Sequence, residues 1–141
     1  MKQELRLSGT GGQGLILAGI ILAEAALLDG KLAIQSQSYG PEARGGSSKS
    51  EVMISEEAIH FPKVTEPNLL LAMSQEAANK YSTDLSPESI LVTDSLFVSK
   101  LPAHSGKVYE LPITHSAKEI LGKALFANII ALGALVKITN I

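Results

Sequence analysis

The chain has 141 residues, 45% of them hydrophobic, and its 12 lysines and arginines nearly balance its 14 aspartates and glutamates. This length predicts one domain that buries its own core, and the balanced charge argues against partners such as nucleic acid or an anionic membrane surface. Because the chain contains no cysteine, disulfides, thiolate chemistry and cysteine-ligated iron–sulfur clusters are excluded within it.

The N-terminal residues lead directly into a predicted strand around residues 5–7 without an apolar signal segment, so we expect a cytoplasmic protein. The three histidines, His60, His104 and His115, lie far apart and form no pair at the spacing of metal ligands. We therefore expect this chain to hold no metal.

A glycine-rich turn follows the first predicted strand. Gly9, Gly11 and Gly14 match the pattern G-x-G-x-x-G between a strand and an apolar helix, and Gly12 and Gln13 lie inside it. Glycine lets the backbone turn tightly and approach a ligand, and the N-terminus of the following helix favours an anion. These five residues are therefore predicted to bind a cofactor. The alternative is a turn that only lets helix and strand pack closely.

One feature of a dinucleotide site is missing from the chain. Nicotinamide-binding domains place an acidic residue at the end of the second strand, about 20 residues after the glycines, where it holds the ribose hydroxyls. The predicted second strand, residues 31–38, carries no Asp or Glu, and no Arg that would accept a 2′-phosphate. The sequence therefore argues against a nicotinamide-dependent dehydrogenase.

The loop after this strand combines side chains of very different chemistry with turn-forming residues. Arg44, one of only two arginines in the chain, suits planar, two-bond recognition of a carboxylate or phosphate. We predict that the loop binds a partner; the alternative is a solvated loop with a local Glu42–Arg44 ion pair. The predicted partner-binding residues are Tyr39, Gly40, Pro41, Glu42, Arg44, Gly45 and Gly46.

The rest of the chain alternates strands and helices. Apolar runs predict strands at 49–55, 68–73, 89–93 and 107–111, and helices are predicted at 75–81, from 116 and at 124–136. Ser116 and Glu119 form the pattern of a capping box at the start of the second of these helices. Asp94 follows a buried strand at the sheet edge where ligands of α/β proteins gather, so it is a candidate cofactor-binding residue; the alternative is a helix or turn cap. The pattern predicts an α/β domain with a largely parallel sheet between helices.

Two helices, at 15–28 and 124–136, are apolar almost all round. A sheet covers only one side of a helix, so we expect the isolated chain to self-associate through the uncovered sides. In the second helix Asn128 is the one polar interior residue, and a buried amide must find hydrogen-bond partners.

Three segments together, residues 9–14, 38–46 and 128–135, resemble the gamma subunit of 2-oxoacid:ferredoxin oxidoreductases, which corresponds to an internal domain of the single-chain pyruvate enzymes. The resemblance covers essentially the whole chain and is closest to the 2-oxoglutarate branch. It implies a three-layer α/β/α domain packed against catalytic subunits. Family members usually continue with further helical sequence, so we expect residues 1–141 to be a single domain that is either short or truncated at its C-terminus.

Enzymes of this family decarboxylate a 2-oxoacid, transfer the acyl group to coenzyme A and pass electrons to ferredoxin. The resemblance implies that alpha and beta subunits hold thiamine diphosphate and that a ferredoxin-like delta subunit holds iron–sulfur clusters. No catalytic residue is identified in this chain, and coenzyme A is its candidate ligand. Two alternatives stay open, a stand-alone nucleotide-binding enzyme and a purely structural adaptor.

Overall fold

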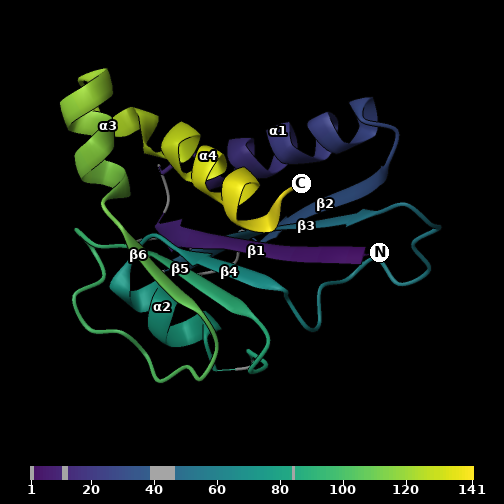
Figure 1. Ribbon diagram of the computed structural model, residues 1–141, viewed down its shortest axis with the longest axis horizontal. Helices are drawn as coiled ribbons and strands as arrows, with labels where there is room; N and C mark the ends of the chain where they lie inside the picture. Colours follow the sequence, from purple (N-terminus) through teal and green to yellow (C-terminus); the bar gives the residue numbers. More distant parts are fainter. Residues whose placement is uncertain (1, 11–12, 39–46, 84) are drawn as a thin grey trace.

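A computed structural model describes residues 2–10, 13–38, 47–83 and 85–141 and places a six-stranded sheet between helices (Figure 1). The strands are β1 (Lys2–Thr10), β2 (Leu32–Ser38), β3 (Ser47–Ser55), β4 (Leu69–Ala72), β5 (Ile90–Asp94) and β6 (Val108–Leu111). The helices are α1 (Leu15–Leu28), α2 (Gln75–Tyr81), α3 (Ile113–Leu121), the short 3-10 helix η2 (Ala124–Phe126) and α4 (Ala127–Thr139).

The sheet has the strand order β2-β3-β1-β4-β5-β6. Strand β1 pairs parallel with β4, and the parallel pairing continues through β5 to β6. On its other side β1 pairs antiparallel with β3, which pairs antiparallel with the edge strand β2. This arrangement confirms the predicted α/β class with a largely parallel sheet.

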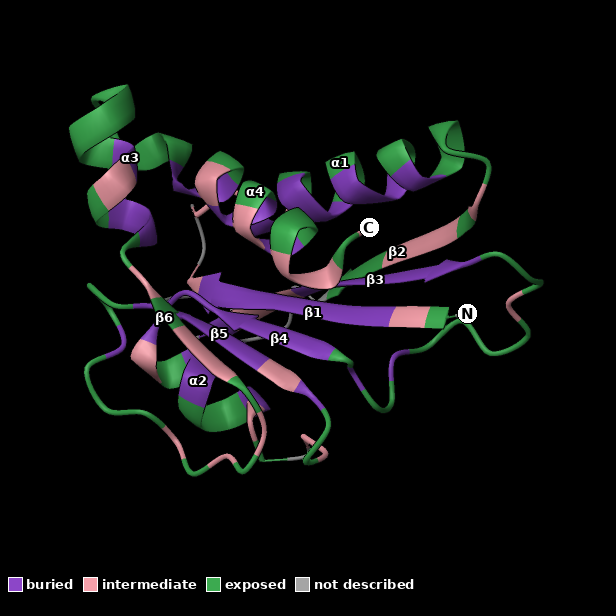
Figure 2. Cartoon of the chain, in the orientation of Figure 1, coloured by how far each residue is buried: buried purple, intermediate pink, exposed green. Residues whose placement is uncertain are grey.

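Two helical layers enclose the sheet, as the resemblance implies. Helices α1, α3 and α4 lie over one face and α2 lies over the other (Figure 1). The central strands are buried on both faces, because every residue of β4 is fully inaccessible to solvent and the apolar run in β5 is nearly so (Figure 2). Buried parallel strands of this kind explain why their sequences read as continuous apolar runs.

Alternate residues of β1 serve the two faces. Leu5 and Leu7 join the core cluster under α1 and α4. Arg6 lies on the other face, opposite Glu51 of β3, and its Nε donates to Glu51 Oε2 at 2.7 Å. Both side chains are buried, and the Arg6 guanidinium lies 5.9 Å from the centre of the Tyr81 ring of α2. A one-residue slip of β1 against β3 would separate this ion pair, so it specifies the register.

Helix α1 packs on the sheet through small residues. Gly19, Ala23 and Ala26 are buried on one side of the helix. A Cβ atom at Gly19 would collide with the hydroxyl of Ser50 on β3, so glycine allows the closest approach of helix and sheet. The opposite side of α1 is open, because Leu17 and Leu27 are each 53% exposed. Self-association of the isolated chain through such surfaces stays a prediction.

Among the described residues, no helix combines the length and the apolar character that crossing a membrane would need.

Two glycines in helices offer a matched test of this packing. Gly19→Ala should lower the free energy of unfolding by about 1 kcal/mol or more, because overpacking against Ser50 exceeds the gain in helix propensity. Gly133→Ala in α4, where nothing lies within 4 Å of the added methyl group, should raise it by about 0.5–1 kcal/mol. Urea denaturation measures both, and equal stabilisation by both variants would contradict the close approach.

Candidate functional site

The carboxyl ends of β1 and β4 lie side by side at the centre of the sheet. From β1 the chain crosses to β2 on one side, whereas from β4 it continues to β5 on the other, so the connections leave this point in opposite directions. Such a switch point leaves a crevice where ligands of open α/β sheets bind. The glycine turn that the sequence predicts as a site begins here.

The side chain of Gln13 spans this switch point. Its Oε1 accepts a hydrogen bond from the Thr10 backbone N–H at 2.8 Å, and its Nε2 donates to the Met73 carbonyl oxygen at 3.0 Å. One carboxamide therefore ties the end of β1 to the residue after β4. The sequence places Gln13 in the turn but carries no local signal for its partner Met73, which lies 60 residues away.

Gly9 leaves room for this arrangement. A Cβ atom at Gly9 would collide with the Gln13 carboxamide oxygen and would lie 2.8 Å from Leu15 Cδ1 and 3.0 Å from Met73 Cβ. Glycine at this position thus permits close packing of strand, turn and helix, as in the packing alternative drawn from the sequence. A direct role of Gly9 in ligand binding stays a prediction.

Gly14 begins α1 in the left-handed conformation, with φ 73°, which favours glycine. The carboxamide of Asn128, in the first turn of α4, donates from Nδ2 to the Gly14 carbonyl oxygen at 3.3 Å. Its Oδ1 accepts from the Ile129 N–H at 3.0 Å. The expectation that this buried amide finds partners is confirmed, and one partner is the glycine turn itself.

Within the part of the chain that the structure describes, no side chain caps the N-terminus of α1, and the first turn of this helix contains no acidic residue. Helix α2 differs, because the Ser74 hydroxyl accepts from the Ala77 N–H at 3.1 Å and Glu76 lies in its first turn. The first N–H groups of α1 and the positive end of its dipole are thus left to a ligand, to water or to residues outside the described ranges.

A hollow of about 250 Å³ adjoins the glycine turn. It combines hydroxyl and amide groups with apolar side chains from the β5–α3 region and from the start of α4. Its lining residues are Thr10, Gln13, Phe97, Thr114, Ala124, Leu125 and Ala127. The hollow lies at the sheet edge where the crevice was expected.

Asp94 ends β5 and is fully buried. Its carboxylate accepts from the Thr114 N–H at 3.3 Å, from the Thr114 hydroxyl, and from the Leu96 N–H at 3.2 Å. Asp94 therefore caps α3 from another element, which supports the capping alternative. A contact of Asp94 with a ligand stays a prediction.

This contact also corrects a detail of the sequence analysis. Helix α3 begins at Ile113, after Pro112, and not at a capping box formed by Ser116 and Glu119. The Ser116 N–H instead donates to the Pro112 carbonyl oxygen at 2.8 Å. A distant carboxylate caps the helix, so the local capping signal is not used.

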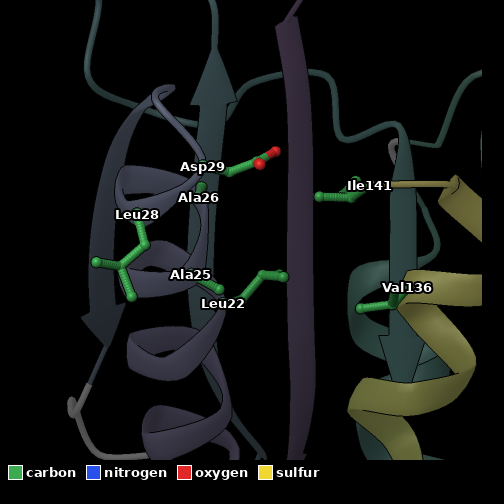
Figure 3. A pocket seen from close by; sticks show the side chains of 7 residues that line it. All are labelled: Leu22, Ala25, Ala26, Leu28, Asp29, Val136 and Ile141. Carbon is green, nitrogen blue, oxygen red and sulfur yellow. The ribbon is translucent and has the colours of Figure 1, made fainter.

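A larger hollow of about 520 Å³ lies between the C-terminal parts of α1 and α4, away from the glycine turn. Leu22 of α1 and Val136 of α4 lie on its two sides, and among the described residues Asp29 is the one charged residue that lines it (Figure 3). It is far from the glycine turn along α1, and its apolar walls offer little for reaction chemistry. The sequence-predicted residues do not converge on it.

Several predicted site residues lie outside the described residues. They are Gly11 and Gly12 of the turn and Tyr39, Gly40, Pro41, Glu42, Arg44, Gly45 and Gly46 of the loop. Of the predicted set, the structure brings Gly9, Gln13 and Gly14 together at the switch point, and it places Asp94 behind Thr114, which lines the adjoining hollow.

The family described as pyruvate ferredoxin/flavodoxin oxidoreductase matches residues 4–141. The chain belongs to this family. The 2-oxoglutarate synthase subunit KorC of Methanocaldococcus jannaschii is 51% identical over 144 residues, which cover 100% of this chain and 77% of that protein.

Solved structures agree with this assignment to the pyruvate ferredoxin/flavodoxin oxidoreductase family. The gamma subunit of a keto/oxoacid ferredoxin oxidoreductase from Geobacter sulfurreducens has a TM-score of 0.91 and 50% identity, covering 99% of this chain and 77% of that one. A 2-oxoglutarate:ferredoxin oxidoreductase from Magnetococcus marinus, with 2-oxoglutarate, coenzyme A and succinyl-CoA bound, has a TM-score of 0.85 at 25% identity, covering 96% of this chain and 24% of that one. The family and fold class predicted from the sequence are confirmed.

The capping of α3 by Asp94 can be tested by measuring the free energy of unfolding. Asp94→Ala should lower the free energy of unfolding by about 2–4 kcal/mol, because it leaves the buried Thr114 donors without their charged acceptor. Asp29→Ala is the matched control: Asp29 is 71% exposed, and its pairing with Lys31 contributes less than about 0.5 kcal/mol. Equal effects in urea denaturation would contradict the capping role.

Proposed function

We propose that this chain is the gamma subunit of a 2-oxoglutarate:ferredoxin oxidoreductase, a complex that oxidatively decarboxylates a 2-oxoacid to an acyl-CoA. The observation that carries the proposal is the 51% identity to a 2-oxoglutarate synthase subunit along the whole chain. The TM-score of 0.91 and the 50% identity to an oxidoreductase gamma subunit also support it. Neither observation favours a stand-alone nucleotide-binding enzyme or a purely structural adaptor.

The partners follow from the same proposal. Alpha and beta subunits would carry thiamine diphosphate, and a ferredoxin-like delta subunit would carry the iron–sulfur clusters, with ferredoxin as the electron acceptor. The composition of this chain supports that division, since it has no cysteine to ligate a cluster. We place the complex in the cytoplasm.

The contribution of this chain to the reaction is to bind part of coenzyme A. The solved relative from Magnetococcus marinus was obtained with coenzyme A bound. In this chain the uncapped N-terminus of α1 and the backbone of the glycine turn suit an anionic group, such as a phosphate of coenzyme A. Gly9, Gly11, Gly12, Gln13 and Gly14 would shape that site.

Blocking the turn tests coenzyme A binding. Gly12→Asp should raise the KM for coenzyme A about tenfold or more in the assembled complex, because it adds bulk and negative charge where an anion would bind. Gly133→Asp, at an open position on α4, is the matched control and should leave this KM unchanged. Calorimetry with coenzyme A, NAD and AMP identifies the ligand class, and an unaltered KM in Gly12→Asp would remove the turn from the site.

The loop of residues 39–46 would dock onto the thiamine-bearing subunits, with Arg44 as its anchor. Arginine is used sparingly here, and the other arginine, Arg6, is committed to a buried ion pair with Glu51. A guanidinium at an interface binds a carboxylate through two hydrogen bonds, which a lysine cannot reproduce. The residues of this loop also carry the most specific part of the resemblance to the family.

Substitution of Arg44 tests this docking. Arg44→Ala should weaken assembly by about 30-fold or more and lower 2-oxoacid-dependent ferredoxin reduction, since loss of a paired interfacial arginine leaves its partner acid unpaired. Arg44→Lys should restore little, and the melting temperature of the chain should stay nearly unchanged. Lys63→Ala, on an exposed loop, is the control for loss of a positive charge. Wild-type assembly and turnover by Arg44→Ala would refute the docking role.

A further inference from the structure

We propose that Gln13 and Asn128 are positioning residues that fix the two described ends of the glycine turn, at Thr10 and at Gly14, and with them the start of α1. The inference rests on the proposed binding of coenzyme A at this turn. Neither side chain is assigned a contact with the ligand; both act through the backbone that would make that contact. Two carboxamides from distant parts of the chain thus converge on one short segment.

Gln13 fixes the beginning of the turn. Both polar atoms of its carboxamide are used, because Oε1 receives the Thr10 N–H and Nε2 reaches the Met73 carbonyl oxygen. Met73 is fully buried next to β4 and its own N–H donates to the Ser8 carbonyl oxygen at 2.8 Å, so the acceptor is itself held rigidly. The start of the turn, at Thr10, is therefore linked through Gln13 to the fully buried Met73.

Asn128 fixes the end of the turn. The Gly14 carbonyl oxygen already accepts the Ala18 N–H at 3.0 Å, which is the first backbone hydrogen bond of α1. Asn128 Nδ2 donates to the same oxygen from α4. A Cβ atom at Gly14 would lie 2.6 Å from this nitrogen, so glycine and asparagine fit each other at this contact. The orientation of the first N–H groups of α1 is thereby fixed.

The chemistry of these positions favours a positioning role over packing alone. Asn128 is 6% exposed, and burying an amide there costs free energy that an apolar side chain would not lose. What the amide supplies is one directed bond to the backbone of the turn. Backbone N–H groups bind an anion tightly only when they already point at one place, so fixing the turn lowers the entropy lost on binding.

The experiment uses the assembled complex with three variants. Gln13→Ala removes both bonds of Gln13, and Asn128→Leu keeps about the size of the side chain and adds no charge but loses the donor to Gly14 and the acceptor for Ile129. Gln75→Ala is the matched control. Gln75 also uses its whole carboxamide, accepting from Ser99 and Lys100 N–H at 3.0 and 2.9 Å and donating to the Lys100 carbonyl oxygen at 2.7 Å, away from the turn.

Two measurements are made on each variant: amide hydrogen exchange of the peptide covering residues 9–15, and KM values for coenzyme A and for 2-oxoglutarate. In Gln13→Ala and Asn128→Leu we expect faster exchange in this peptide. We expect the KM for coenzyme A to rise about 3- to 10-fold, with the KM for 2-oxoglutarate and kcat at saturating coenzyme A unchanged. Gln75→Ala should change neither the exchange of this peptide nor either KM.

Unchanged exchange in both variants would overturn the inference, because the turn would then hold its shape without them. Faster exchange with an unchanged KM for coenzyme A would overturn it as well. Gly12→Asp distinguishes the reasons for such a failure. If Gly12→Asp raises this KM while Gln13→Ala and Asn128→Leu do not, the turn binds coenzyme A without the positioning residues. If Gly12→Asp, Gln13→Ala and Asn128→Leu all leave this KM unchanged, the proposed coenzyme A site fails too.

Discussion

The structure depends on hydrogen bonds at the end of β1, where the connections from β1 and β4 leave toward opposite edges of the sheet. Strands β1 and β4 run in parallel, but the chain leaves them toward opposite edges of the sheet. Backbone groups where the two strands end therefore lose their regular partners at a partly buried position, where an unpaired group costs about 1–3 kcal/mol if fully buried. The Gln13 carboxamide satisfies one such donor and one such acceptor, at Thr10 and Met73. A single side chain thereby links the end of β1 to the residue after β4 and fixes the position where the turn begins.

The two faces of the sheet around this point are built on different principles. Toward α1 and α4 the contact is apolar and close, and glycine at position 19 allows the helix to reach Ser50. Toward α2 the sheet buries the Arg6–Glu51 ion pair beneath Tyr81. The apolar contact supplies most of the free energy of burial, whereas the directed ion pair favours one register of β1 against β3.

The fold could be predicted from the sequence because its signals are local. Continuous apolar runs indicated β4 and β5, and glycines with alternating residues indicated β1 and the start of α1. The links of the candidate site could not be predicted, since they join residues 60 and 114 positions apart, as in Gln13–Met73 and Asn128–Gly14. A buried polar residue in an apolar helix was the one local signal of such a link at Asn128. It predicts that a partner exists and does not say which.

The contrast between local and distant signals also explains why Asp94, and not Ser116, caps α3. The capping box at Ser116 is a local pattern, but the buried Asp94 carboxylate at the end of β5 accepts from the Thr114 N–H and hydroxyl, so α3 begins ahead of Ser116. The carboxylate of Asp94 thus caps α3, whereas α1, whose start adjoins the same hollow, has no side-chain cap from the described residues. Of the N-termini of α1 and α3, only that of α3 is neutralised by an acidic side chain among the described residues. An anionic ligand is therefore favoured at the glycine turn over the neighbouring start of α3.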